Sequence, residues 1–148
     1  MFRIEYKIIQ EQFIGIERMS DEEIRYNFLL GNLILFSPGT RIEMDWEWIP
    51  LLDFAYCLKE IVSNLKTNDY SKEYFEFTEN AETLSFSRQR EGLKIVASFS
   101  STVIETTLID FEKAVHDFHF SISEHIRRNI SNKPPRVLQK YLAVEIFN

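Results

Sequence analysis

The three histidines of the chain are His116, His119 and His125, and a carboxylate, Glu112, precedes them at a spacing that helices use to hold metals. At about 100° per residue, Glu112, His116 and His119 would lie within about 60° of one another on a helix. Such a group could bind zinc or iron. No second segment offers a matching histidine or cysteine motif, so we expect a solvated helix face and no metal or other cofactor. Glu112, His116 and His119 are the candidate ligands if a metal does bind.

Residue types for nucleophilic or phosphate chemistry are present but not arranged in a known pattern. Cys57 is the single cysteine, so it has no partner for a disulfide. A catalytic role would need a base, which a histidine of the predicted 108–131 helix could provide, but we expect a structural or incidental cysteine. The glycines are scattered and form no phosphate-binding loop, and no Gly-x-Ser-x-Gly motif occurs; they are Gly15, Gly31, Gly39 and Gly92. We therefore expect no nucleotide hydrolysis, no serine-hydrolase chemistry and no catalytic residues.

A more unusual pattern is Glu43-Met44-Asp45-Trp46-Glu47-Trp48, in which three carboxylates alternate with Met44 and the only two tryptophans. An extended chain would place the carboxylates on one face and the apolar side chains on the other. Carboxylates steer the approach of a basic partner and aromatics anchor it, so we interpret Glu43, Asp45, Trp46, Glu47 and Trp48 as a candidate binding site. The alternative is that the tryptophans belong to the core and the acids are solvated.

The elements that would position these residues follow from the periodicity of apolar side chains. Alternation with period two predicts antiparallel strands near residues 2–9, 75–77, 84–86, 93–99 and 103–108. A run of aromatic and branched residues followed by the Pro38-Gly39 turn predicts two more, near 26–36 and 41–45, which gives about six or seven strands in all. Apolar spacings of three and four predict two main helices, over about 50–66 and 108–131. Ser20 and Glu23 match a capping box and predict a short helical turn. We expect an α+β fold with a single antiparallel sheet packed against the two helices.

Length and charge limit the class of protein. The chain has 148 residues and a net charge of −6, which fits one domain and disfavours nucleic acid as a partner. Its N-terminus lacks the apolar core of a signal peptide, and no apolar run is long enough to span a membrane, so we expect a cytoplasmic protein. The residues from 132 to 148 are expected to form a peripheral basic segment of the domain. Five of the basic residues lie between Arg127 and Lys140 without an acid.

The order of core positions resembles a group of small uncharacterised bacterial domains of the immunity-protein type. The resemblance covers about residues 25 to 130 and rests on Gly31, the Pro38-Gly39 turn, Leu52-Asp53-Phe54-Ala55, Phe75-x-Phe77, Leu84-x-Phe86, Phe111 and Phe118. It implies an α+β fold, a bacterial cytoplasmic protein and binding to another protein. It carries no functional residue over to this chain.

These observations favour a non-enzymatic protein-binding domain, specifically an immunity protein that masks a basic toxin surface. The alternative is a housekeeping or small-ligand-binding α+β domain with an apolar pocket between sheet and helices. A third hypothesis is an enzyme that uses the helical histidines, and a homodimer is compatible with each.

Overall fold

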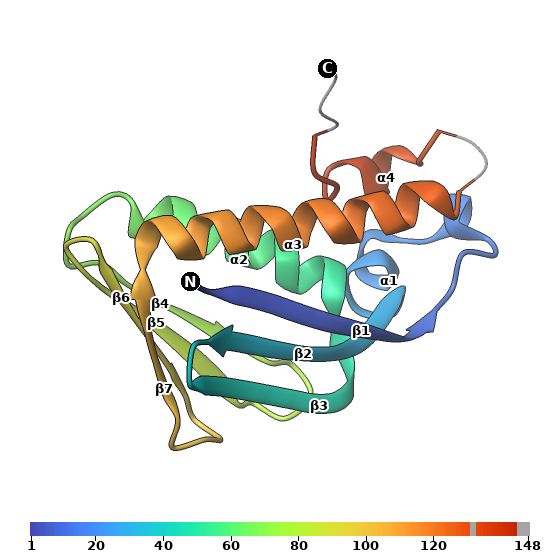
Figure 1. Ribbon diagram of the computed structural model, residues 1–148. Coiled ribbons are helices and arrows are strands. Elements are labelled where there is room, and N and C mark those ends of the chain that lie inside the picture. The colour runs from blue at the N-terminus through green and yellow to red at the C-terminus, as the bar shows by residue number, and fades with distance from the viewer. Residues whose placement is uncertain (131–132, 145–148) are drawn as a thin grey trace.

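The computed structural model describes residues 1–130 and 133–144, which form seven strands, four helices and one short 3-10 helix (Figure 1). In chain order these are β1 (Arg3–Glu11), the 3-10 helix η1 (Ile16–Arg18), α1 (Asp21–Tyr26), β2 (Leu29–Ser37), β3 (Thr40–Pro50), α2 (Leu51–Leu65), β4 (Lys72–Glu76), β5 (Thr83–Gln89), β6 (Gly92–Ala97), β7 (Val103–Thr107), α3 (Leu108–Arg128) and α4 (Arg136–Gln139). The protein is α+β, as its sequence predicts.

The strands form two antiparallel sheets, so the prediction of a single sheet of six or seven strands is wrong. One sheet has the order β1-β2-β3 and the other β4-β5-β6-β7, with each strand beside its sequence neighbour. Helix α2 separates β3 from β4 in the chain, so the meander breaks there and the second sheet starts anew. The two sheets lie at an angle to each other, below the paired helices α2 and α3 (Figure 1).

The two main helices agree with their predicted ranges to within a few residues. Helix α2 follows Pro50, whose missing N–H costs nothing at a helix start. Helix α3 begins after Thr107, whose hydroxyl oxygen accepts a hydrogen bond from the backbone N–H of Asp110 at 3.1 Å. Ser20 and Glu23 form the predicted capping box at the start of α1. Local sequence signals therefore set the helix boundaries.

The core joins both sheets to both helices through phenylalanine rings. Phe111 of α3 contacts Phe2, beside β1, at 5.7 Å between ring centroids and Phe86 of β5 at 5.3 Å. Phe54 of α2 stacks on Phe77, just after β4, at 5.8 Å. Aromatic pairs at these separations add to the stability gained from burial. Phe111 of α3 thus links the first sheet to the second, and Phe54 attaches α2 to the second sheet.

The C-terminal segment has buried side chains in the part that the structure describes. Leu138 of α4 is 0% exposed and Tyr141 is 4% exposed. The Tyr141 hydroxyl donates to Asp21 Oδ1 at 2.6 Å, and Arg127 donates to the carbonyl oxygen of Ala143. Residues 131–132 and 145–148, to which the predicted end of the second helix and the end of the basic segment belong, lie outside the described residues. Across the described ranges, no helix has the length and apolar character needed to span a bilayer.

Candidate functional site

Strand β3 continues to Pro50, beyond the predicted end at residue 45, and it is irregular over residues 45–48. The ladder pairs Leu33 with Met44 and Gly31 with Ile49, so Asn32 alone lies opposite the four residues 45–48. Within this bulge Glu47 has a φ of 68°, a left-handed conformation that costs about 1 kcal/mol for a residue with a side chain. The backbone N–H of Glu47 donates to Asn32 Oδ1 at 2.7 Å. The bulge is therefore a specifically held feature.

The two tryptophans of the bulge lie against each other and against the second sheet. Their rings are stacked, with centroids 5.4 Å apart and an interplanar angle of 13°. Trp46 also makes T-shaped contacts with Phe77 and Phe99, with ring centroids 5.0 Å and 4.8 Å apart. Both tryptophans are half-buried, whereas Met44 is fully buried. Trp46 and Trp48 therefore combine a packing role with an accessible ring surface.

The carboxylates of this segment are all exposed to solvent. Glu43 Oε1 is 3.1 Å from a guanidinium nitrogen of Arg41. Asp45 and Glu47 have no ion pair within the described part of the chain. Two unneutralised carboxylates thus flank the half-buried Trp46.

A second acidic segment, which the sequence interpretation did not assign to the site, lies beside the tryptophans. Because Phe77 contacts both Trp46 and Trp48, the turn after β4 is brought next to β3. Segments 43–48 and 76–82 together carry six carboxylates and no Lys or Arg. In that turn Ala81 also has a positive φ, of 58°. We call segments 43–48 and 76–82 together with Phe99 the acidic–aromatic surface.

Two of the three candidate metal ligands have other partners within the protein. Glu112, His116 and His119 line one pocket, but Glu112 pairs with Lys66 at 3.0 Å and His119 Nε2 lies 2.6 Å from the carbonyl oxygen of Tyr141. Over residues 1–130 and 133–144, no three His, Cys, Asp or Glu side chains are grouped closely enough to share a metal ion. His125 is elsewhere engaged, with Nε2 2.6 Å from Glu11 Oε2.

Cys57 lies in a polar cluster between α1 and α2. Burial raises the pKa of the Cys57 thiol to about 12, so at neutral pH it is protonated and a poor nucleophile. Next to it Arg25 Nε donates to Asp53 Oδ1 at 2.8 Å, and the Asp53 side chain is only 8% exposed. The cluster therefore joins α1 to α2 and offers no activated nucleophile.

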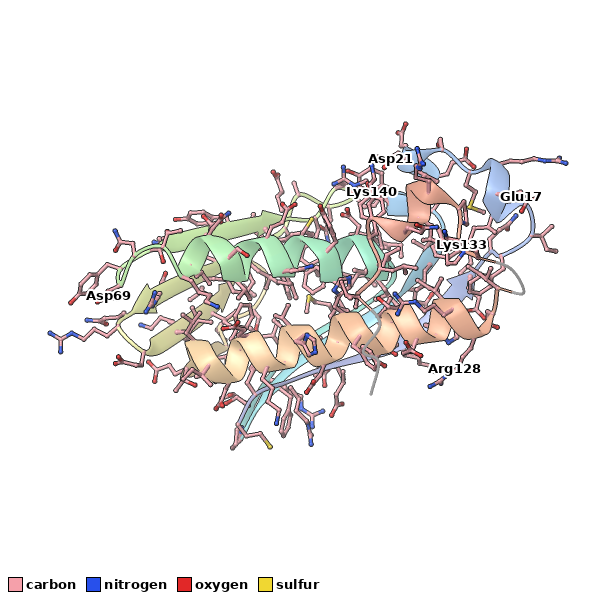
Figure 2. All side chains as sticks on the ribbon, turned by 90° about the horizontal axis from the view of Figure 1, so that it is seen from above. Glu17, Asp21, Asp69, Arg128, Lys133 and Lys140 are labelled. Carbon is pink, nitrogen blue, oxygen red and sulfur yellow. The ribbon has the colours of Figure 1, made fainter. Side chains whose placement is uncertain are left out.

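The basic stretch between Arg127 and Lys140 is divided between structural and exposed cations. Lys140 Nζ lies 2.6 Å from Asp21 Oδ1, and the two residues are neighbours in Figure 2. Arg127 Nη1 lies 3.2 Å from Glu124 Oε1. Arg128, Lys133 and Arg136 are exposed. Part of the basic character of this stretch thus serves to attach the C-terminal segment.

Comparison of the chain with models of known protein families, with curated proteins and with solved structures found no match.

Proposed function

We propose that the chain is a non-enzymatic protein-binding domain that uses the acidic–aromatic surface to cover a basic surface of another protein. The immunity-protein type, in which the covered surface belongs to a toxin, is the form of this proposal that the sequence resemblance favours. The bulge at residues 45–48 is the observation that carries it.

The bulge supports binding because it carries a backbone cost at Glu47 and leaves the rings of Trp46 and Trp48 partly accessible. A regular strand would avoid the positive φ of Glu47. Instead the backbone is held in that conformation by Asn32 and leaves both indole rings half-buried between exposed carboxylates. Backbone strain maintained by surrounding contacts is typical of functional segments.

The chemistry of the surface favours a basic partner. Unpaired carboxylates at Asp45 and Glu47, with the acids of segment 76–82 beside them, attract positive charge and raise the rate of encounter. Tryptophan is enriched among the residues that contribute most to interface affinity, because it buries a large area at low entropic cost. A rigid stacked pair, already packed on Phe77, would lose little further freedom on binding.

The alternative of an apolar ligand pocket between sheet and helices has less support. The rings of Phe54, Phe77, Phe86 and Phe111 pack in that region, and each is at most 1% exposed.

A capture experiment with two charge-matched variants tests the proposal. The immobilised protein is exposed to a lysate of its native host, and retained proteins are identified by mass spectrometry. The test variant carries Glu43→Lys, Asp45→Lys and Glu47→Lys, and the control carries Glu17→Lys, Glu22→Lys and Glu91→Lys at exposed acids elsewhere. Each Glu→Lys or Asp→Lys substitution raises the charge by two, so both variants have a formal net charge of zero.

We expect the wild type and the control variant to retain the same basic protein and the test variant to lose it. Equal retention by all three proteins would exclude the acidic–aromatic surface as the binding site. Retention of no protein at all would contradict the protein-binding class.

A further inference from the structure

A pocket of about 360 Å³ lies between α2 and α3 and the C-terminal segment, away from the acidic–aromatic surface. The two helices run side by side when seen from above (Figure 2). The pocket opens on the exposed side of the pair, where Lys59, Ser63 and Lys66 are exposed. It is lined by Lys59, Val62, Ser63, Lys66, Glu112, Val115, His116, His119, Ala143 and Val144.

The inner walls of the pocket are apolar. Val62 of α2, Val115 of α3 and Ala143 are buried against the core, with 7%, 3% and 6% of their surfaces exposed. The volume is at the lower end of the range of small-molecule sites, about 300–1,000 Å³. The pocket therefore suits the apolar body of a small molecule.

One polar ring, that of His119, is buried in these walls. It is 5% exposed, and Nε2 must carry a proton because its partner, the carbonyl oxygen of Tyr141, can only accept. Burial lowers the pKa of His119, so the ring is neutral at pH 7 and Nδ1 is a hydrogen-bond acceptor. No described residue donates to Nδ1. Because His119 lines the pocket, a bound molecule could supply that donor.

The rim of the pocket is more basic than the chain as a whole. Lys59 has no ion pair within residues 1–130 and 133–144. Lys66 forms an ion pair with Glu112, in which Lys66 Nζ lies 3.0 Å from Glu112 Oε1. The free ammonium of Lys59 favours a negatively charged group at the mouth.

We propose that the pocket between α2 and α3 binds a small organic anion whose apolar body lies between Val62 and Val115. Its anionic group lies against Lys59 and Lys66, and an N–H or O–H of the ligand donates to His119 Nδ1. This site is independent of the protein-binding surface proposed above.

8-Anilinonaphthalene-1-sulfonate is a suitable probe, because it combines apolar rings, a sulfonate and an N–H donor. Its fluorescence is titrated with the folded wild-type protein, and we expect saturation at one site per chain. Octanoate should displace it, whereas octylammonium, with the same apolar body and the opposite charge, should not. Displacement by both ions to the same extent would overturn the assignment of an anionic ligand.

Three exposed positions test the location without disturbing the core. Lys59→Glu should weaken binding by about fivefold, the upper range for an exposed ion pair. Lys113→Glu, an exposed change on α3 outside the pocket, should leave affinity within about twofold by the same scale. Ser63→Trp should block the mouth and abolish binding. Equal effects of the two lysine variants, or binding that Ser63→Trp leaves intact, would refute the site.

The role of His119 has its own readout. The ¹⁵N resonance of Nδ1 should move when the probe binds, while the ring resonances of His125, which pairs with Glu11, stay unchanged. An unmoved Nδ1 resonance at saturation would remove His119 from the site.

Discussion

The side-chain oxygen Oδ1 of Asn32 accepts a hydrogen bond from the backbone N–H of Glu47 at 2.7 Å, across the only ladder position where four residues of β3 face one residue of β2. This contact holds Glu47 at a φ of 68° and fixes the path of the chain between the two tryptophans.

Glu47→Gly should stabilise the protein and weaken its binding to a basic partner. Glycine adopts positive φ without a steric penalty, so the free energy of unfolding should rise by about 1 kcal/mol. The same change removes one carboxylate from the acidic–aromatic surface. Urea unfolding followed by circular dichroism measures the first effect and the affinity for the captured protein the second. A loss of stability would show that the conformation of Glu47 is not strained.

The two tryptophans should differ in their contribution to stability. Trp46 packs on Trp48, Phe77 and Phe99, whereas Trp48 has no ring contact with Phe99. We expect Trp46→Ala to lower the free energy of unfolding by about 2 kcal/mol, because a half-buried ring is lost, and Trp48→Ala to lower it by less. The midpoints of the two denaturant-unfolding curves give the comparison, provided that both curves have the same slope. Equal losses would mean that the bulge packs through both rings alike.

His119 should make the attachment of the C-terminal segment sensitive to acid. Burial lowers its pKa below the ordinary 6.5, so the folded state prefers the neutral ring. The stability that this provides is complete above pH 6.5 and falls as the pH drops below that value toward the pKa of the folded state. Unfolding measured between about pH 7.5 and about pH 5 should show this loss in the wild type and a smaller loss in His119→Gln. His116→Gln, at an exposed position, should retain the wild-type slope.

Breaking the Arg25–Asp53 ion pair should have an effect that depends on which partner is removed. Asp53 is 8% exposed and Arg25 34%, so Arg25→Gln leaves the more deeply buried charge unpaired and should cost about 3 kcal/mol. Asp53→Asn should cost less, because water can reach the guanidinium. Arg41→Gln, which breaks the exposed pair with Glu43, should change stability by no more than about 0.5 kcal/mol.

The same variants should also differ in their response to pH. Burial raises the pKa of Asp53, an effect that Arg25 opposes, so removing Arg25 raises that pKa further. A carboxyl whose pKa is raised by folding favours the folded state at low pH, and this contribution is lost as the pH rises through the folded pKa. The free energy of unfolding of Arg25→Gln should therefore be closest to that of the wild type at low pH. If the loss of stability caused by Arg25→Gln does not vary with pH, Asp53 is already protonated in the wild type.

Local patterns in the sequence predict the elements of this fold well, and the reasons are specific. The apolar residues of α2 and α3 recur every three or four positions, and Pro50, Thr107 and the Ser20–Glu23 box provide helix starts. Each of the seven strands overlaps a range predicted from the sequence, although β3 continues to Pro50 and β4 begins at Lys72, outside the predicted 41–45 and 75–77. Alternation of apolar and polar residues indicates which face of a strand is buried, but it does not indicate which sheet the strand joins. For that reason the division at α2 into two sheets could not be predicted.

The candidate site was predictable only in part for a similar reason. The composition of residues 43–48 identified Glu43, Asp45, Trp46, Glu47 and Trp48 as unusual, and the structure leaves the three carboxylates exposed. The bulge depends on the long-range bond from Glu47 to Asn32, fifteen residues away, and no local signal indicates it. The contribution of segment 76–82 depends on Phe77 meeting the tryptophans across two sheets.

The rate at which the captured protein associates with this chain tests the central claim most directly. The association rate constant is measured by stopped-flow tryptophan fluorescence from about 20 mM to about 500 mM salt, because screening shortens the range of charge attraction over this interval. We predict a fall of at least about tenfold for the wild type and a slow, nearly salt-independent rate for the Glu43→Lys, Asp45→Lys, Glu47→Lys variant. A rate that neither salt nor these three substitutions change would contradict a partner-binding role for the acidic–aromatic surface.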